Sequence, residues 1–190
     1  MLELSALGLL QQEPLHGYRL KQRLELFLSS AMSVNYGAIY PLLKRLEERG
    51  QVQVLLEESG DAGASRRIYA VTEAGCDHWR EKMLEHPQES WVKSRARFLV
   101  KYFFFGSLEP GERVQLIESR LRVCHQRQTY LNSQEMGKLV ADSFQVATWE
   151  RARFMLKSEM DWLQECLEKE QSGALTSTSR KVLTEFNVIL

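Results

Sequence analysis

Residues suited to contact a nucleic acid recur along one side of the segment NYGAIYPLLKRLEERG, residues 35–50. On a helical wheel, Tyr36, Tyr40 and Lys44 share one face of this segment. The opposite face is apolar and carries Ala38, Ile39, Leu42, Leu43 and Leu46. Phenol and ammonium groups reach phosphates and base edges in a DNA groove, and Gly37 lets the backbone come close. The alternative is that both tyrosines pack against a neighbouring helix.

Pro41 stands inside this helical pattern, where it removes a backbone hydrogen bond and its ring presses on the carbonyl group of residue 37. That residue is Gly37, the type whose backbone shifts at the lowest cost. We therefore expect Gly37 and Pro41 to act as a pair that re-aims the first turn of the helix. In the competing interpretation the helix begins at Pro41, where proline is favoured, and NYGAIY forms a turn.

Positive charge is concentrated around this segment, although the chain as a whole carries 25 Lys and Arg against 25 Asp and Glu. Between His16 and Arg49 there are six basic residues and three acidic ones. Arg66 and Arg67 add positive charge at the base of an expected β-hairpin, where they would reach phosphates or the minor groove. The alternative is that these two arginines only protect an edge strand. Nucleic-acid binding must rest on local charge, because the net charge is zero.

Catalytic and metal-binding residues are sparse and scattered. The sequence has four histidines and three cysteines, with no CxxC pair and no zinc-ligand spacing. It contains no GxSxG, P-loop, HExxH or dinucleotide-binding motif. We therefore expect no enzyme, no metal and no cofactor, and we interpret the cysteines as reduced thiols of a cytoplasmic protein.

No apolar segment is long enough to cross a membrane, so we expect no interaction with a membrane. The most apolar one, residues 98–106, contains Lys101 and is far shorter than the ~20 residues that span a bilayer. The N-terminus has no basic region before its apolar residues, and Glu3 interrupts them, so we expect no signal peptide. A cytoplasmic location follows from these expectations.

Apolar spacing divides the chain into predicted helices and strands. Helices are expected over 2–11, 18–28, 35–49, 73–86, 89–106, 107–134 and 147–171. Thr72 is the predicted N-cap of the fourth helix, and Ser107 followed by Pro110 signals the start of the sixth. Alternating residues predict two strands, 51–57 and 66–72, joined by a Gly/Ser-rich loop. Three helices followed by a β-hairpin form the arrangement of a winged helix-turn-helix.

We therefore predict a mainly α fold with a small β-hairpin. Residues 1–87 would form a winged helix-turn-helix DNA-binding domain. Residues 88–172 would form a helical region for dimerisation and effector binding, and residues 173–190 a C-terminal tail.

Three segments, PLHGYRLKQRLE, NYGAIYPLLKRLEERG and RRIYAVTEAG, resemble the signature segments of PadR-type transcriptional regulators. They occur in the family's order and at its usual spacing over residues 4–80. The family often has a Trp-Pro pair before its recognition helix, where this chain has SSAMSVN. The resemblance and the helical face together point to DNA contacts by His16, Tyr18, Asn35, Tyr36, Gly37, Tyr40, Pro41, Lys44, Arg45, Arg66 and Arg67. His16 is interpreted as a helix-start or phosphate-contact residue.

The long helical C-terminal region resembles the larger PadR subfamily, which includes phenolic-acid-responsive repressors and AphA-type virulence activators. The resemblance implies a homodimer made by these helices, a palindromic double-stranded operator, and a small aromatic or apolar effector. Aromatic residues that could line an effector site are Trp91, Phe98, Tyr102, Phe103, Phe104 and Phe105. The alternative for these rings is that they form part of the core.

A continuous apolar stripe marks the last predicted helix, at steps of three and four residues from Trp149 to Leu167. We expect an intersubunit helix bundle formed by Leu156, Met160, Trp162, Leu163 and Leu167. A symmetric dimer would place two recognition helices about one DNA turn apart, roughly 34 Å. The alternative is an intramolecular core helix. The sequence thus predicts a DNA-binding repressor, and the competing function is a winged-helix module that binds another protein.

Overall fold

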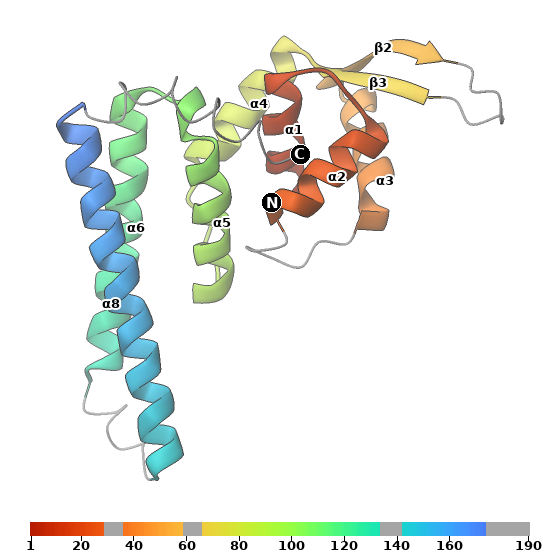
Figure 1. Cartoon of the computed structure of the whole chain (residues 1–190). Coiled ribbons are helices and arrows are strands. Elements are labelled where there is room, and N and C mark those ends of the chain that lie inside the picture. Colours follow the sequence, from red (N-terminus) through yellow and green to blue (C-terminus); the bar gives the residue numbers. More distant parts are fainter. Residues whose placement is uncertain (29–35, 59–65, 134–141, 174–190) are drawn as a thin grey trace, which may run out of the picture. The chain divides into compact units, whose positions relative to one another are not determined.

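The computed structural model of the chain describes residues 1–28, 36–58, 66–133 and 142–173 (Figure 1). The chain forms two compact units, Met1–Ser107 and Leu108–Leu190. The first unit ends after the predicted domain boundary at residue 87, because the next helix is grouped with the N-terminal elements. Nearly all of the predicted tail, from residue 174 onward, lies outside the described residues.

The first unit combines helices with a small antiparallel sheet. Its helices are α1 (Leu2–Gln12), α2 (Gly17–Leu28), α3 (Ile39–Glu48), α4 (Glu73–Leu84) and α5 (Trp91–Phe103). Two short 3-10 turns, η1 (Tyr36–Ala38) and η2 (Phe105–Ser107), precede α3 and follow α5. The strands are β1 (Leu15–His16), β2 (Val52–Glu58) and β3 (Arg66–Val71), in the sheet order β1-β3-β2. The predicted mainly α fold with a winged helix-turn-helix is confirmed.

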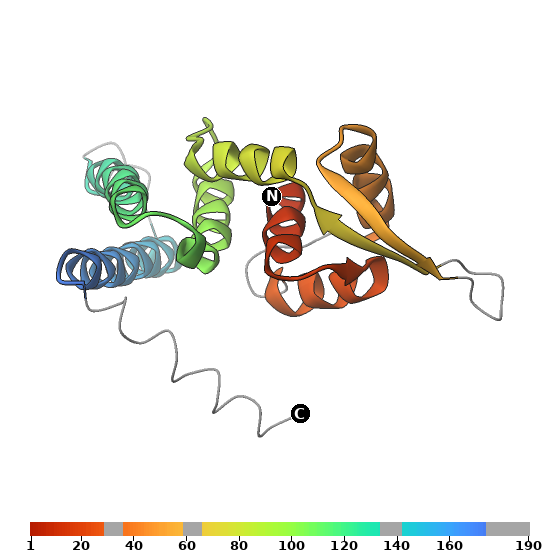
Figure 2. The same cartoon turned by 90° about the horizontal axis from the view of Figure 1, so that it is seen from above.

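The β2–β3 hairpin extends away from α1, α2 and α3, as both views show (Figures 1 and 2). Its register pairs Val52 with Val71 and Val54 with Tyr69, and an irregularity follows between Val54 and Leu56. The short β1 completes the sheet by pairing Leu15 with Tyr69. The sequence predicts no helix or strand between residues 11 and 18, because a two-residue strand has no visible period.

The core of the first unit lies among the first three helices. Seven consecutive residues of α1, from Leu4 to Leu10, are buried, so this helix is surrounded on all sides. The side chains of Leu20, Leu24, Ile39, Leu43 and Leu46, in α2 and α3, are completely buried as well. A Cβ built on Gly8 would lie 2.7 Å from the Phe104 ring, so α1 and the segment after α5 are in close contact. This contact explains why α5 belongs to the first unit.

The end of α3 is fixed by two glycines and a threonine. Gly50 has a φ of +68°, the left-handed conformation that ends a helix. The Thr72 hydroxyl donates to the Gly50 carbonyl oxygen at 2.6 Å and accepts from the Gly75 amide at 3.1 Å. The predicted N-cap of α4 is therefore confirmed, and the same side chain ties α4 to the end of α3.

The second unit is an antiparallel pair of helices, α6 (Pro110–Leu131) and α8 (Ser143–Gln171) (Figure 1). Arg113 Nε lies 2.9 Å from a Glu170 oxygen at one end of the pair. In the middle, Arg120 Nη2 lies 2.7 Å from a Glu159 oxygen. At the far end, Trp149 Nε1 donates to the Leu131 carbonyl oxygen at 2.8 Å.

The starts of both helices differ from the predicted ones. Glu109 is the N-cap of α6 and forms a capping box with Glu112, while Pro110 is the first helical residue. Asp142 caps α8 by accepting from the amides of Phe144 and Gln145 at 2.8 and 3.0 Å. The sequence placed this start at residue 147, because the apolar stripe begins only at Trp149.

Candidate nucleic-acid interface

Helix α3 separates an apolar face from a polar one. Ile39, Leu42, Leu43 and Leu46 are at most 3% exposed. On the other side, Tyr40 is 55% exposed and the side chain of Lys44 is 78% exposed. Pro41 and Arg45 are exposed as well. The helix therefore has the two faces that its sequence predicts, and the polar face is open to solvent in the described part of the chain.

Pro41 occupies the first turn of α3, two residues after the helix begins at Ile39. The first four amides of a helix have no intrahelical partner, so a proline there costs no hydrogen bond. The interpretation in which the helix begins at Pro41 is wrong, since Ile39 is helical and completely buried. Gly37 precedes the α-helix in the 3-10 turn η1, so the helix predicted over residues 35–49 also begins later than expected, at Ile39.

Tyr40 lies against the start of α2. A Cβ built on Gly17 would lie 2.8 Å from the Tyr40 ring, so the ring covers this glycine while more than half of the side chain stays exposed. Gly17 stands between His16 and Tyr18 in the sequence. The first two signature segments, which are far apart along the chain, thus meet at one place on the surface.

The two neighbours of Gly17 have different environments. Tyr18 is 61% exposed, and its hydroxyl accepts from the Gln22 side-chain amide at 3.1 Å. His16 is partly buried, and its Nδ1 has no hydrogen-bond partner among the described residues. A buried nitrogen without a hydrogen-bond partner is uncommon in a folded protein, and water or a ligand frequently supplies the missing partner.

Arg67 forms an ion pair with α3. Its Nη1 and Nη2 donate to the two carboxylate oxygens of Glu47 at 3.1 and 3.2 Å. The guanidinium carbon also lies 6.0 Å from the centre of the Tyr69 ring. This bidentate pair joins β3 to α3, a role that was not predicted for either residue. The sequence contains opposite charges in α3 and β3, but it does not show which residues of the two elements lie side by side.

Three of the expected contact residues are not described in full. Asn35 lies outside the described residues, and for Tyr36 and Arg66 the structure describes the backbone only. Arg19, which the sequence analysis counted only as part of the local positive charge, is exposed on α2 next to Tyr18. It adds an exposed cation within the first signature segment.

The expected effector-lining rings pack largely on one another. Phe98, Phe104 and Phe105 are at most 6% exposed. The Tyr102 and Phe105 rings are 4.8 Å apart, and the Trp79 and Phe104 rings are 6.1 Å apart at a right angle. The alternative interpretation, that these rings form core, therefore describes Phe98, Phe104 and Phe105, whereas Phe103 is 52% exposed.

Lys101 stands among these rings and is 4% exposed. Its ammonium donates to the Glu85 carbonyl oxygen after α4. Burial lowers the pKa of Lys101 to about 8, with a further contribution from the nearby Arg97 charge. Arg97 itself is paired with Glu89. These polar contacts fasten α5 to the segment that follows α4.

The residues expected at the dimer interface fall into two groups. Leu156, Leu163 and Leu167 are at most 9% exposed within the single chain, as an intramolecular core helix requires. Met160 and Trp162 are only partly buried. Contact of these five residues with a second copy stays a prediction.

Two family models match the chain. Residues 6–81 match the transcriptional regulator PadR-like family, and residues 94–170 match the virulence activator alpha C-term family. The negative transcriptional regulator PadR of Bacillus subtilis (strain 168) is 26% identical over 123 residues, which are 64% of this chain and 66% of that protein. The match thus spans just under two thirds of the relative.

Solved structures of similar proteins include Bacillus subtilis PadR in complex with operator DNA, at 23% identity and a TM-score of 0.43, covering 89% of this chain and 98% of that chain. The complex of the same protein with p-coumaric acid has 21% identity and a TM-score of 0.40, covering 90% and 95%. The protein smu.1604c from Streptococcus mutans UA159 has 26% identity and a TM-score of 0.43, covering 88% and 98%.

No helix among the described residues is long and apolar enough to cross a membrane. No group of three or more His, Cys, Asp or Glu side chains in the described ranges could hold a metal ion.

Proposed function

We propose that this chain, which matches the transcriptional regulator PadR-like family over residues 6–81, represses transcription by binding a palindromic operator as a homodimer. The observation that carries this proposal is the open polar face of α3, with Tyr40, Lys44 and Arg45 exposed opposite a completely buried apolar face. A helix of this kind enters the major groove with its polar face toward the bases.

The proposed roles follow from the chemistry of each side chain. Lys44 and Arg45 would contact phosphates, because their cations stand at the end of long exposed side chains. Tyr40 would reach a base edge or a phosphate from beside the start of α2. The same surface would include His16, Tyr18, Asn35, Tyr36, Gly37, Pro41 and Arg66. For Arg67 the contact with Glu47 supports an indirect role in place of the expected phosphate contact.

Two further parts of the proposal, repression and a response to an effector, are suggested by similar proteins. The Bacillus subtilis relative is named a negative regulator, and a similar structure holds p-coumaric acid. We accordingly propose that a small aromatic or apolar molecule weakens operator binding by this chain. Such a molecule would act by binding more tightly to the conformation that does not fit DNA.

A test of this function starts with DNA from upstream of the protein's own gene. We expect protection of a palindromic site, and binding that weakens steeply with salt. Changing Tyr40 and Lys44 together to alanine should abolish the preference for this site over random duplex. Circular dichroism and sedimentation should show unchanged helix content and oligomeric state. If the unaltered protein never prefers upstream DNA over random duplex, the proposal is wrong.

One observation favours a second function, a winged-helix module that binds protein. Leu55 and Leu56 on β2 are 53% and 48% exposed, which is unusual for two adjacent leucines. Their replacement by serine distinguishes the two functions. It would leave operator binding intact under the main proposal, and it would remove partner binding under the second.

A further inference from the structure

Three of the described glycines in the first unit lie where a side chain would meet a neighbouring group. A Cβ built on Gly8 would lie 2.7 Å from the Phe104 ring, and one built on Gly75 would lie 2.0 Å from a backbone carbonyl oxygen. At Gly17 the nearest group is the ring of Tyr40, at 2.8 Å. Contacts this short do not persist in a folded chain, so an alanine at any of these positions forces one of the two groups to move.

The groups beside these glycines differ in their freedom to move. Phe104 is buried, and the oxygen beside Gly75 belongs to the backbone, so neither has space to move into. Tyr40 is more than half exposed, and the atom nearest to Gly17 is Cε1, near the outer end of the ring. Rotation about the side-chain bonds of Tyr40 would relieve the contact and carry the ring toward solvent. A Cβ at Gly17 would therefore displace one surface side chain and leave the core intact.

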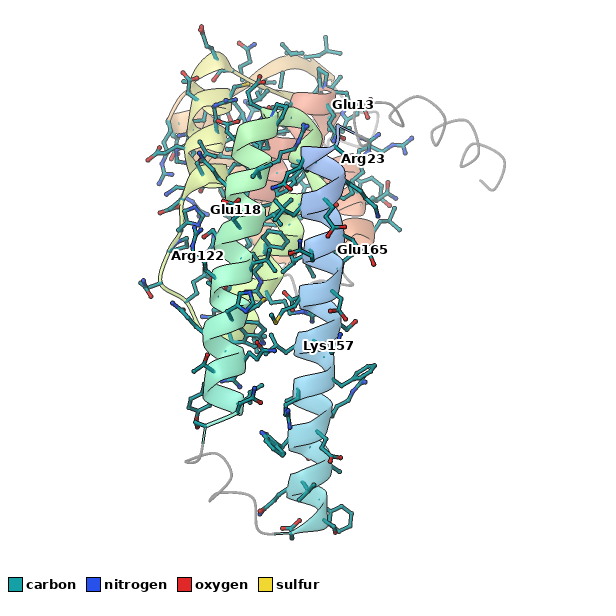
Figure 3. The ribbon with its side chains drawn as sticks, turned by 90° about the vertical axis from the view of Figure 1, so that its left-hand side faces the viewer. Glu13, Arg23, Glu118, Arg122, Lys157 and Glu165 are labelled. Carbon is teal, nitrogen blue, oxygen red and sulfur yellow. The ribbon has the colours of Figure 1, made fainter. Side chains whose placement is uncertain are left out.

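The backbone around Gly17 is held on both sides. The two residues before it form β1, which is paired with β3. After it, Leu20 of α2 is completely buried. Arg23 of the same helix forms an ion pair with Glu13, the residue that follows α1, and Figure 3 labels both side chains. The start of α2 is thus fixed, and it cannot withdraw from Tyr40.

Tyr40 is fixed at its backbone in the same way. Its neighbours on α3, Ile39 and Leu43, are completely buried. A Cβ built on Gly17 would lie 3.6 Å from Leu43 Cδ1, which is an ordinary van der Waals distance. Among the described residues, the group that an alanine at position 17 would displace is therefore the Tyr40 ring.

The glycine at position 17 provides space and not an unusual backbone conformation. The described glycines with a positive φ are Gly50 and Gly173. The backbone at Gly17 therefore accepts an alanine, which also favours a helix more than glycine does. An alanine would, however, occupy the space that the Tyr40 ring takes over residue 17.

We propose that Gly17 is a positioning residue for sequence recognition, because it lets the Tyr40 ring lie against the start of α2 and present its hydroxyl at one place on the surface. This inference rests on the proposed function, in which Tyr40 contacts DNA, and adds a residue that acts through the ring. A side chain already held in its binding conformation loses less conformational freedom on binding. Contacts to base edges need accurate placement, whereas phosphate contacts by Lys44 and Arg45 do not depend on the ring.

The first experiment compares the binding of Gly17→Ala to an operator duplex and to a random duplex by fluorescence anisotropy. We expect the ratio of operator affinity to random-duplex affinity to fall about three- to tenfold, with random-duplex affinity changed less than about twofold. Circular dichroism should show unchanged helix content. A loss of helix would mean that movement of the ring does not accommodate the Cβ, and the inference would be wrong.

Gly111→Ala is the matched control. Gly111 lies in the first turn of α6, as Gly17 lies in the first turn of α2, and nothing lies within 4 Å of a Cβ built there. This variant should leave the ratio of the two affinities unchanged. An equal fall in both variants would contradict a specific role for Gly17.

A double-mutant cycle with Tyr40→Ala shows whether Gly17 acts through the ring. Without the ring, the space over residue 17 is open, so Gly17→Ala should cause no further loss in the Tyr40→Ala background. Equal losses in both backgrounds would show that Gly17 contacts DNA itself or supports the fold, and the inference would be wrong.

A third experiment observes the ring without DNA. Tyrosine labelled with carbon-13 in the ring is introduced into the full chain, and the signals of Tyr40 are identified among those of the six tyrosines by their absence from Tyr40→Ala. In Gly17→Ala these NMR signals should shift, and a soluble gadolinium chelate should broaden them more strongly, because the ring has moved toward solvent. In Gly111→Ala they should keep their positions. Unchanged Tyr40 signals in Gly17→Ala would overturn the inference.

The outcomes separate this inference from the proposed function. If the unaltered protein never prefers upstream DNA over random duplex, the proposed function and the recognition role of Gly17 are both wrong. If it prefers the operator and Gly17→Ala keeps the full preference, only the role of Gly17 is wrong.

Discussion

Glu47 of α3 and Arg67 of β3 form a bidentate ion pair across twenty residues of sequence, with N–O distances of 3.1 and 3.2 Å. Both side chains are about one third exposed, at 32% and 38%. A two-point contact fixes orientation as well as distance, which a single Lys–carboxylate contact cannot do. Helix α3 and the base of the β2–β3 hairpin are therefore held in one arrangement.

Removing this pair should reduce the preference for the operator. In Glu47→Gln the wing and the helix lose their fixed orientation, and we expect the ratio of operator affinity to random-duplex affinity to fall about three- to tenfold. Arg67→Lys should act in the same direction, because an ammonium group cannot make the bidentate contact. Fluorescence anisotropy with both duplexes measures the ratio.

The control for this prediction is Glu48→Gln. Glu48 is the neighbouring acid, 61% exposed, and its oxygen is 3.9 Å from Lys44 Nζ. Losing this charge should strengthen binding to both duplexes equally and leave the ratio unchanged. If Glu47→Gln behaves like Glu48→Gln, Arg67 contacts phosphate directly and the pair has no positioning role.

A second prediction concerns Gly75 at the start of α4. A Cβ at this position would lie 2.0 Å from the Gln51 carbonyl oxygen and 2.7 Å from Val71. The oxygen belongs to the backbone and already accepts from the Thr72 amide at 3.1 Å, so it cannot move aside at low cost. Gly75→Ala should lower the free energy of unfolding by about 2 kcal/mol or more. Urea denaturation followed by circular dichroism measures this change.

Gly106→Ala is the matched control in the same unit, since nothing lies within 4 Å of a Cβ built there. Its free energy of unfolding should stay within about 0.5 kcal/mol of the unaltered protein. If Gly75→Ala and Gly106→Ala change the free energy of unfolding equally, the close approach of α4 to residue 51 is unimportant for stability.

The parts of the fold that could be predicted are those that depend on residues close together in the sequence. The two faces of α3 follow from its helical period, and the N-cap at Thr72 follows from one side chain and the helix after it. The Glu47–Arg67 pair could not be predicted, because it depends on how the hairpin packs against α3. The apolar stripe of α8 correctly indicated a helix. A stripe of this kind fits α6 of the same chain as well as a second copy, so its partner was not determined.

A third prediction is a pH dependence caused by Lys101. Burial lowers its pKa to about 8 in the folded chain, below the ordinary value of 10.5. Between these two pH values the unfolded chain holds more protons than the folded one, so the free energy of unfolding contributed by this residue rises with pH. Below about pH 8 its contribution is constant. The unaltered protein should thus gain stability relative to Lys101→Met as the pH rises from 8 to 10.5.

Denaturation curves of the two proteins across this range test the prediction. Lys93→Met provides the control, because Lys93 is exposed on the same helix. The difference in stability between Lys93→Met and the unaltered protein should not change with pH. If the stability difference between Lys101→Met and the unaltered protein also stays constant with pH, Lys101 has its ordinary pKa in the folded protein and the prediction is wrong.

A fourth prediction concerns the ion pair between Arg120 and Glu159 inside the second unit. Arg120 Nε and Nη2 lie 2.9 and 2.7 Å from the same Glu159 oxygen, and the two side chains are only 3% and 8% exposed. Removing one partner leaves a charge buried opposite an apolar group. Arg120→Met alone should therefore lower the free energy of unfolding by about 3 to 5 kcal/mol.

The double variant Arg120→Met with Glu159→Leu removes both charges together and should recover most of that loss, because apolar residues of similar volume replace the pair. A double-mutant cycle built from the four denaturation curves gives the coupling energy between the two residues. Lys157 and Asp161, an exposed pair one turn apart on the same helix, serve as the comparison, with an expected coupling below about 0.5 kcal/mol. Strong coupling at the buried pair and weak coupling at the exposed one would show that burial, and not charge pairing alone, makes Arg120 and Glu159 hold α8 on α6. Additive single effects at Arg120 and Glu159 would contradict this.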